Sequence, residues 1–534
     1  MTSLCARCAG TLQIRVNLSS AEISKIENDL RSEFERAEEV KQMLALADKD
    51  IEDHDSEIAR LHGQILIIKE KKRQLEAQRA RLRALFSPIR KLPNEILLRI
   101  LQHVCERNRL CDYDVEGSSY IPSISYFPAM VISSVCSRWR DLALSSPRLW
   151  ANLTVEIYTR DEAREPRFMN MLTRLLERSN KWPLRLSLNR VGFQIHSNIN
   201  YYLPDQTLPL PFLDLLFQHA YHWETFTFQA LYPLTFYMKP SGLHFPSLLE
   251  LNIKDFERNP LAPFNKVEYL HLQRMSIDLA SPPVLAKILH NYPSLKSLSL
   301  ELKPFEEEDA EVSDLMVQGT WRNIACLVIK AFERPWLLNM AFSSFSFPSL
   351  NELVVESECH TNNWPVDAFK SFVTTSSCMI TTFTLRGFTV SDVDLIATLQ
   401  VMPSISYLEI DDFEDSSPQN PIISQSPITS HFMQSLQHQS TSFPLAPKLH
   451  SLRLISKRTV PFDDLTFISM IESRWFKPGS DLSAAMFSIG KACIRSVVLT
   501  FSWREVDAEV YQPLRNLDAE GLRVVVAGTN GVQV

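Results

Sequence analysis

The stretch that decides how this 534-residue chain is organised is Leu92-Pro93-Asn94-Glu95-Ile96-Leu97-Leu98-Arg99-Ile100-Leu101. Proline is accepted in the first turn of a helix and Glu95 lies near the positive end of the helix dipole, so this stretch predicts the start of a short helix. Its apolar residues recur at one-turn spacing and form a wide stripe. The preceding Ser87-Pro88 separates this helix from earlier residues, because proline cannot continue a helix.

A second amphipathic segment is predicted at 130–144, followed by a Ser-Ser-Pro break and Trp150. Val131, Val135 and Trp139 share one face of this segment. Two short helices cannot bury this much apolar surface between themselves, so part of it is expected to face a partner. The alternative is a helical hairpin that caps the rest of the chain, with Trp139 in its core.

These segments resemble the F-box, the helical module by which substrate receptors dock on the Skp-type adaptor of cullin-based ubiquitin ligases. The shared pieces are Leu-Pro-x-Glu-Ile-Leu-x-x-Ile-Leu at 92–101, Val-Cys-x-x-Trp-Arg-x-Leu-Ala at 135–143 and Pro-x-Leu-Trp at 147–150. The resemblance implies an F-box-like domain at 88–150. It also implies ten residues in adaptor contacts or in the module core, and these are the candidate partner-binding residues: Leu92, Pro93, Ile96, Leu97, Ile100, Leu101, Val135, Cys136, Trp139 and Trp150.

The sequence departs from the F-box pattern in the separation of its two halves. About thirty residues lie between them, more than is usual, and long surface loops cost little stability. The segment 105–128 contains Gly-Ser-Ser and two prolines, so it is predicted to be a surface insertion.

The residues before the module predict a long coiled-coil helix at 19–87. No proline and one glycine interrupt them, and a heptad register with Ile23 as the first a position and Ile26 as the first d position is mostly apolar to Phe86. Ser19 or Ser20, with Glu22 in the first turn, is the expected N-terminal cap. Residues 1–18 are predicted to be flexible. Their lone Cys5-x-x-Cys8 pair supplies two of the four ligands that zinc needs, so it is either a pair of incidental thiols or half of a site completed by a second chain.

Charge is divided along this helix. There are 13 acidic and 6 basic residues at 20–62, against 2 acidic and 9 basic residues at 69–91. One interpretation is a solvated helix with cations near its C-terminus, where the helix dipole favours them. The other is an antiparallel pairing of the acidic half with the basic half, in a homodimer or in a folded-back hairpin.

Residues 151–534 predict a divergent leucine-rich-repeat solenoid with a flexible insertion at 416–447, inside which 431–436 is a candidate helix. The pattern apolar-x-x-apolar-x-apolar recurs, as in Leu248-Leu251-Ile253, Leu295-Leu298-Leu300 and Leu350-Leu353-Val355. Helical stretches separate the copies, which indicates a parallel sheet with helices outside it. Trp150-Leu153-Val155 is a weaker first copy, so the F-box-like module is expected to pack against the array.

The fold class predicted is α plus an α/β repeat, and the expected function is non-catalytic. No phosphate-loop, metal-protease or nucleophile-elbow motif is present, so no cofactor or metal is expected. The net charge of −7 gives no reason to expect nucleic acid or an anionic membrane. No apolar run approaches the ~18–20 residues that span a bilayer. Nine scattered cysteines favour a reducing compartment, so the protein is expected to be intracellular, cytoplasmic and/or nuclear.

The order of long helix, F-box and irregular leucine-rich array also resembles a large expanded family of fungal F-box proteins. This resemblance implies a substrate-recognition adaptor that contacts a Skp-type subunit, and a cullin scaffold through it, while the array binds an unidentified protein substrate. A homodimer through the coiled coil is a further expectation. The alternative function is a scaffold that uses the same module outside any ligase.

Overall fold

The computed structural model describes residues 2–3, 11–12, 14–30, 37–111, 127–156, 165–191, 211–230, 245–254, 266–275, 281–302, 319–331, 336–357, 364–412, 426–438, 445–457, 462–476 and 492–532. The fold is mixed α/β with one large, mostly parallel sheet. The chain divides into two compact units, Met1–Leu97 and Leu98–Val534. The division falls inside helix α3 (Asn94–Val104), so it differs from the predicted boundary at residue 88.

The first unit contains a long helix, α2 (Ala37–Leu85), preceded by a shorter one, α1 (Ser20–Leu30). A reciprocal cap begins α1, since the Ser19 backbone N–H donates to the Glu22 carboxylate and the Glu22 N–H donates to Ser19 Oγ. After α2, Ser87 is extended and Pro88 opens the short 3-10 helix η2 (Pro88–Lys91), as the sequence predicts. The structure thus confirms the predicted cap and the predicted end of the helix.

The prediction of one continuous helix at 19–87 is wrong at its N-terminal end, because the chain folds back there. Arg15 donates to the carboxylates of Asp50 and Asp53 over 2.7 Å, and the Val16 N–H also donates to Asp50. These contacts join residues more than thirty positions apart in the sequence. In one continuous helix such residues would be far apart along the axis and could not touch. Strands β1 (Thr2–Ser3) and β2 (Thr11–Leu12) pair antiparallel within the segment predicted to be flexible.

The second unit is built on a 15-stranded sheet whose strands follow one another in chain order. All neighbours from β3 to β18 are parallel, and β19 adds one antiparallel partner at the end. The strands are β3 (Asn108–Cys111), β4 (Asn152–Glu156), β5 (Leu184–Val191), β6 (Trp223–Ala230), β7 (Glu250–Lys254), β8 (Tyr269–Met275), β9 (Ser297–Leu302), β11 (Cys326–Ala331), β13 (Glu352–Ser357), β14 (Thr382–Arg386), β15 (Tyr407–Asp411), β16 (Ser451–Ser456), β17 (Ser496–Phe501), β18 (Arg523–Gly528) and β19 (Gly531–Val532).

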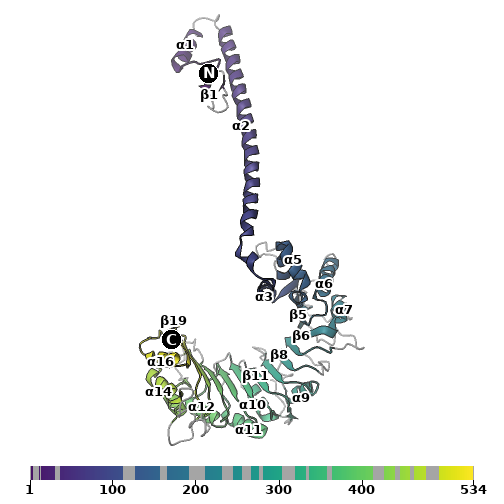
Figure 1. The fold of residues 1–534 in the computed structure, drawn as a ribbon, viewed down its shortest axis with the longest axis vertical. Helices are drawn as coiled ribbons and strands as arrows, with labels where there is room; N and C mark the ends of the chain where they lie inside the picture. The colour runs from purple at the N-terminus through teal and green to yellow at the C-terminus, as the bar shows by residue number, and fades with distance from the viewer. Residues whose placement is uncertain are drawn as a thin grey trace. The chain divides into compact units, whose positions relative to one another are not determined.

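The helices of this unit alternate with its strands. They are α4 (Pro128–Val135), α5 (Ser137–Ser145), η4 (Pro147–Leu149), α6 (Glu165–Ser179), α7 (Pro211–Gln218), η5 (Ala220–His222), α9 (Pro282–His290), α10 (Trp336–Ser344), α11 (Val366–Ser376), α12 (Asp392–Gln400), α13 (Ser430–Leu436), α14 (Asp464–Arg474) and α16 (Gln512–Ala519). A separate parallel pair is formed by β10 (Gly319–Thr320) and β12 (Phe345–Ser346). Figure 1 shows the sheet of this unit curving, with α9 to α14 on its outer side.

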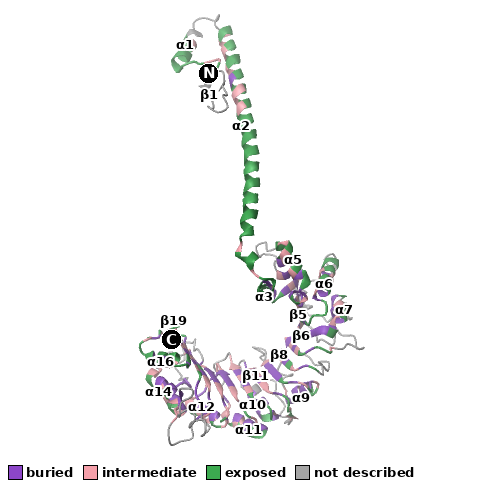
Figure 2. Ribbon diagram, viewed as in Figure 1, coloured by how far each residue is buried: buried purple, intermediate pink, exposed green. Residues whose placement is uncertain are grey.

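The strand register aligns the repeated apolar residues in two columns. The first column joins Leu153, Leu186, Phe226, Leu251, Leu270, Leu298, Leu327, Leu353, Phe383, Leu408, Leu452, Val497 and Val524. The second joins Val155, Leu188, Phe228, Ile253, Leu272, Leu300, Ile329, Val355, Leu385, Ile410, Leu454, Leu499 and Val526. Every member is buried, which Figure 2 shows as the purple interior of the sheet.

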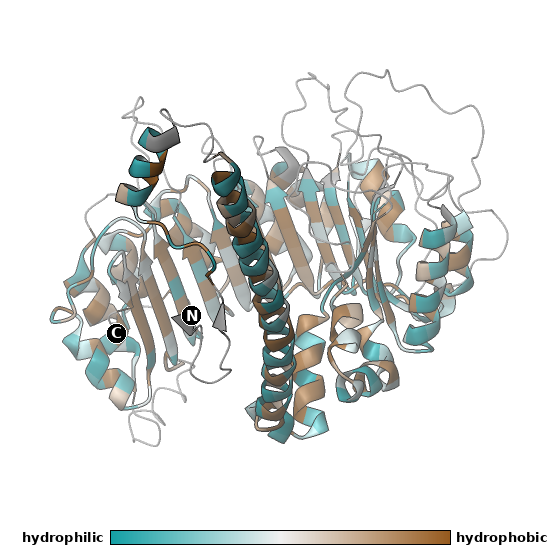
Figure 3. Cartoon of the chain, turned by 90° about the horizontal axis from the view of Figure 1, so that it is seen from above, coloured by the Kyte–Doolittle hydropathy of each residue, from teal (hydrophilic) through white to brown (hydrophobic). Residues whose placement is uncertain are grey.

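The core lies between this sheet face and the helices. Phe347 and Phe372 approach to 6.2 Å between ring centroids, and Trp364 lies 5.2 Å from Phe369. Apolar and polar residues alternate along the strands, as Figure 3 shows, so the opposite face is polar. Burial of one face explains why the register is strict, since a shift by one residue would expose the whole apolar set.

Two segments predicted as insertions contain ordered elements. Residues 108–111, inside the predicted insertion at 105–128, form β3 and extend the main sheet beside β4. Helix α13, inside the predicted flexible insertion at 416–447, buries Phe432, Met433 and Leu436. The predicted insertion at 105–128 is therefore wrong at β3, whereas α13 confirms the helix expected at 431–436. Residues 112–126, 413–425 and 439–444 lie outside the described residues.

Candidate protein-docking site

Helix α3 carries two apolar rows with different surroundings. The row of Leu97 and Leu101 is buried, at 0% and 2% exposure, and Cys105 continues it just beyond the helix. The row of Ile96 and Ile100 is 45% exposed at both residues, and Val104 follows it at 54%. Residues four apart lie on the same side of a helix, so α3 presents one row to the protein core and the other to solvent.

Helices α4 and α5 meet at Cys136, which is extended and therefore turns the chain between them. Arg140 Nε donates to the Ser133 carbonyl over 2.9 Å, which ties α5 back to α4. On α4, Ala129 and Ile132 are buried, whereas Val131 and Val135 are exposed. The α4–α5 pair thus repeats the arrangement of α3, with one apolar side inward and one outward.

Trp150 fixes the end of this helical module to the array. Its side chain is fully buried, and its Nε1 donates to the Ala143 carbonyl over 2.7 Å. The Arg178 guanidinium of α6 lies over the indole ring, 4.5 Å from its centroid. A buried indole with its N–H satisfied and a cation on its face is a packing anchor.

Asn108 is a second anchor, and sequence reasoning missed it. Its side-chain amide donates to the carbonyls of Leu149 and Asn152 over 2.8 and 3.1 Å, and its oxygen accepts from the Ala129 N–H. The side chain is fully buried, at the column position that Leu153 occupies in the next strand. One amide therefore joins α4, η4 and the first strands of the sheet.

The structure divides the ten candidate partner-binding residues into three groups. Leu97, Leu101 and Trp150 are buried, so of the two expected places they occupy the module core. Leu92, Cys136 and Trp139 are half-buried. Pro93, Ile96, Ile100 and Val135 are exposed. Three further apolar side chains of the module are exposed although they are not among the ten candidates: Val104, Val131 and Leu144.

The cysteines near this module are poor nucleophiles. Burial raises the pKa of Cys105 to about 11. Burial, assisted by the Glu156 carboxylate, likewise raises the pKa of Cys111 to about 11. Both thiols are therefore protonated at neutral pH, and protonated thiols neither attack substrates nor hold metals well. The module's chemistry is that of an apolar contact surface.

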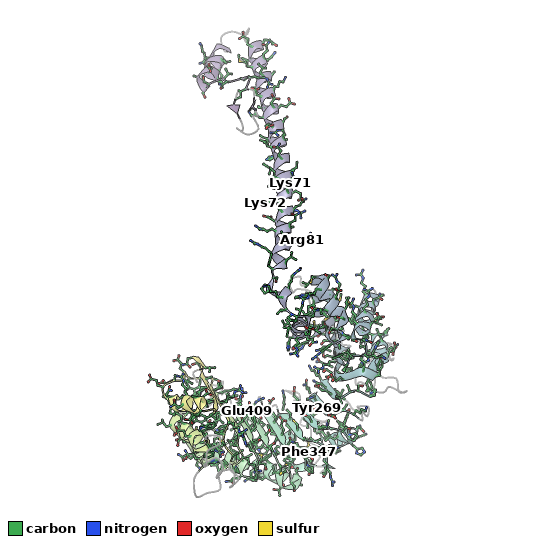
Figure 4. The ribbon with its side chains drawn as sticks, viewed as in Figure 1. Lys71, Lys72, Arg81, Tyr269, Phe347 and Glu409 are labelled. Carbon is green, nitrogen blue, oxygen red and sulfur yellow. The ribbon has the colours of Figure 1, made fainter. Side chains whose placement is uncertain are left out.

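The polar face of the sheet carries a second feature, a ladder of ion pairs across β11 to β16. Arg386 donates to Glu409 over 2.8 and 3.0 Å and also pairs with Glu356. Lys330 lies 3.4 Å from Glu356, and the Tyr407 hydroxyl donates to Glu409 over 2.6 Å. Figure 4 shows Tyr269 and Glu409 on the strand face opposite the helices, with Phe347 on the helix side.

The positive side chains of the ladder are only partly covered. The Lys330, Arg386 and Arg453 side chains are 40–46% exposed, whereas Glu409 is nearly buried. Burial raises the pKa of Asp411, although its contact with Lys457 opposes this. The positive ends of these side chains therefore lie nearer to solvent than the carboxylates that pair with them. Tyr269 is exposed on the same face of the sheet.

No protein-family model matches the chain, and no curated protein has a significantly similar sequence. Within the described residues, no group of three or more His, Cys, Asp or Glu side chains is placed to hold a metal ion. In the same part of the chain, no helix combines the length and apolar character needed to cross a bilayer.

Proposed function

We propose that this protein is a non-catalytic substrate adaptor of a Skp–cullin–F-box type ubiquitin ligase. In this proposal the 88–150 module is F-box-like and docks on a Skp-type subunit. The sheet and its outer helices are a divergent leucine-rich-repeat solenoid that binds a protein substrate, and α2 is a coiled-coil helix. A receptor of this kind needs no catalytic residue, because it raises the local concentration of substrate near a separate transfer enzyme.

The observation that carries the docking proposal is the division of apolar residues within the module. Hydrogen bonds of the Trp150 and Asn108 side chains join α4, α5, η4 and β4. Ile100, Val131 and Val135 nonetheless remain exposed. Large apolar side chains gathered on a rigid element of a folded protein are typical of a docking surface.

The array supports the second half of the proposal. Its polar strand face presents Tyr269 and the partly exposed cations of the ladder on a rigid parallel sheet. Curved repeat arrays commonly use such a face to bind extended protein surfaces. The contact between module and array through Trp150 and Arg178 would hold the substrate at a constant orientation to the docked ligase.

The test is co-purification of the full chain with Skp-type and cullin subunits. Ile100→Asp and Val135→Asp each place a charge at an exposed apolar position, so both should weaken capture at least about tenfold while leaving the fold intact. Val393→Asp is the matched control, because Val393 is equally exposed but lies on α12 of the array. Leu97→Asp is unsuitable, since it would place a charge in the core.

Two outcomes would contradict the proposal. If neither subunit is captured by the intact chain, the module does not serve a ligase, and the scaffold function becomes the better interpretation. If both are captured equally by Ile100→Asp, Val135→Asp and the control, then docking uses another surface.

A further inference from the structure

Helix α2 carries an apolar stripe that its own unit leaves uncovered. The a positions Leu44, Ile51, Ile58, Ile65 and Phe86 and the d positions Leu61, Ile68, Leu75 and Leu82 are 38–81% exposed. In Figure 2 almost the whole helix is green. The stripe extends for about 60 Å at 1.5 Å per residue, which is more than the three or four heptads that a coiled coil requires.

The N-terminal segment covers only part of this helix. Residues 15–16 bond to Asp50 and Asp53, and Val40, Met43 and Ala47 are half-buried on the same side of α2. The a positions Leu44 and Ile51 stay exposed beside this contact, and nothing in the described chain shields 58–86. The fold-back therefore lies over the d positions Val40 and Ala47 at the acidic end, which stay partly exposed, and it leaves the a row free.

Charges within the stripe select the direction of any pairing. Lys72 and Arg79 occupy a positions in the basic half, where Figure 4 shows Lys71, Lys72 and Arg81 projecting from the helix. In a parallel, in-register pair, each of these cations would face its own copy across the seam. In an antiparallel pair they face the acidic half instead, at His54 and Ala47 of the partner, beside carboxylates.

We propose that α2 associates antiparallel with α2 of a second copy of this chain, about a two-fold axis near residue 63. Antiparallel coiled coils place a positions opposite d positions. With this axis, Ile65 faces the partner's Leu61, Ile58 faces the partner's Ile68, and Leu44 faces the partner's Leu82. Every apolar a position from Leu44 to Ile65 then meets an apolar d position.

The flanking charges agree with this register. Asp55 lies beside the partner's Lys69 and Glu57 beside the partner's Lys71, and the two-fold axis repeats both pairs. A parallel pair would instead place Asp50 beside the partner's Asp55. Leu66 and Ile67 lie outside the seam, so this pairing leaves them exposed. The inference goes beyond the proposed function, because it needs neither an adaptor nor a substrate.

Charge reversal in the full chain tests the direction. Asp55→Lys/Glu57→Lys and Lys69→Glu/Lys71→Glu each turn four attractive contacts of the pair into repulsive ones, so each variant alone should dissociate roughly a hundredfold more readily. An equal mixture of the two variants restores all four contacts and should form a heterodimer as tight as the natural pair. Sedimentation measures the mass in each case.

A matched control separates this effect from net charge. Glu52→Lys/Glu70→Lys changes the charge by the same amount at exposed b and f positions, which face away from the seam. It also removes an i,i+3 ion pair, Glu70 with Arg73, just as the first variant removes Glu57 with Arg60. This control should sediment as a dimer. Circular dichroism confirms that each variant keeps its helix.

Photo-crosslinking tests the register. A benzophenone side chain at position 82 should crosslink to a peptide around residue 44. The two positions are about 57 Å apart along one helix, so such a product must join two chains. The proposal is overturned by a natural chain that sediments as a monomer at tens of micromolar, by crosslinking of position 82 to the partner's position 82, or by a variant mixture that stays dissociated.

Discussion

Helix α2 and the repeat sheet both carry a regular pattern of apolar residues, but this pattern is buried in the sheet and exposed on the helix. In the sheet, each apolar column residue meets equivalents from the strands on either side, and all are buried. Along α2, the large apolar side chains at a and d positions from Leu44 to Phe86 remain 38% or more exposed. A repeat array supplies its own partners along the chain, whereas a long amphipathic helix needs a partner from elsewhere.

A core substitution in the sheet is expected to lower stability more than any other change considered. Phe383 is fully buried between Leu353 and Leu408 in its column, and its ring lies 5.9 Å from that of Trp364. Phe383→Ala should lower the free energy of unfolding by about 4 kcal/mol, because it leaves a cavity in a packed core. Urea unfolding, with hydrogen exchange of β13 to β15, measures the loss.

Met379→Ala is the control for this substitution. Met379 lies near the start of the same strand but is 71% exposed, so the change should stay within about 0.5 kcal/mol. Equal losses in the two variants would mean that burial in the column does not determine stability.

The junction of module and sheet is expected to show the next largest effect. Asn108→Leu gives this strand the apolar residue that its column has elsewhere, yet it should destabilise the unit by about 2–3 kcal/mol. The reason is that the carbonyls of Leu149 and Asn152 and the Ala129 N–H lose a buried partner. Thermal unfolding checks this, and an unchanged midpoint would show that the three groups find other partners.

On α2 the effect should depend on concentration. Leu75→Gln removes an exposed d residue, so at nanomolar chain it should change the free energy of unfolding by less than about 0.5 kcal/mol. At tens of micromolar it should lower the melting temperature of the natural chain, because it weakens a contact that forms only on association. A melting temperature that does not vary with concentration in the natural chain would contradict this difference.

The smallest effect is expected at the fold-back, through Asp50. Desolvation opposes the charged carboxyl, but the hydrogen bonds from Arg15 and Val16 outweigh it and lower the pKa of Asp50 below its ordinary value of 3.8. A lowered folded-state pKa means that the contact is complete above about pH 4 and is lost as the pH falls through that pKa. Residues 14–19 should then exchange amide hydrogens faster, and Asp50→Asn should have the same effect at neutral pH.

Much of the array could be predicted from sequence because its signal is periodic and local. The apolar positions of the repeats are visible in the sequence, and the strand register aligns the copies, including the weaker one at Trp150-Leu153-Val155. The break at Ser87-Pro88 was equally clear, since proline acts on its immediate neighbours. An apolar residue at every second position indicates a strand, and apolar residues three or four positions apart indicate a helix. This periodicity is enough to predict the type of each element.

The same reasoning failed where a polar residue does the work of an apolar one. Strand β3 was predicted as part of an insertion because Asn108 is polar where the other strands have an apolar residue. Its amide is buried because it donates to carbonyls of residues distant in sequence. Arg474 is similar, since its buried guanidinium donates to the carbonyls of Leu436, Leu445 and Ala446, and desolvation lowers its pKa to about 9. Such partners are brought together only by the fold.

Within the helical module at 88–150, sequence determined which residues are apolar and which helices they occupy. The tertiary structure decided that Leu97, Leu101 and Trp150 face inward while Ile100 and Val135 face solvent. It also decided that the helix predicted at 19–87 folds back at Arg15 and Asp50. The physical reason is that periodicity shows which apolar residues share one side of a helix. Only the tertiary contacts decide which of these sides is buried and which stays exposed.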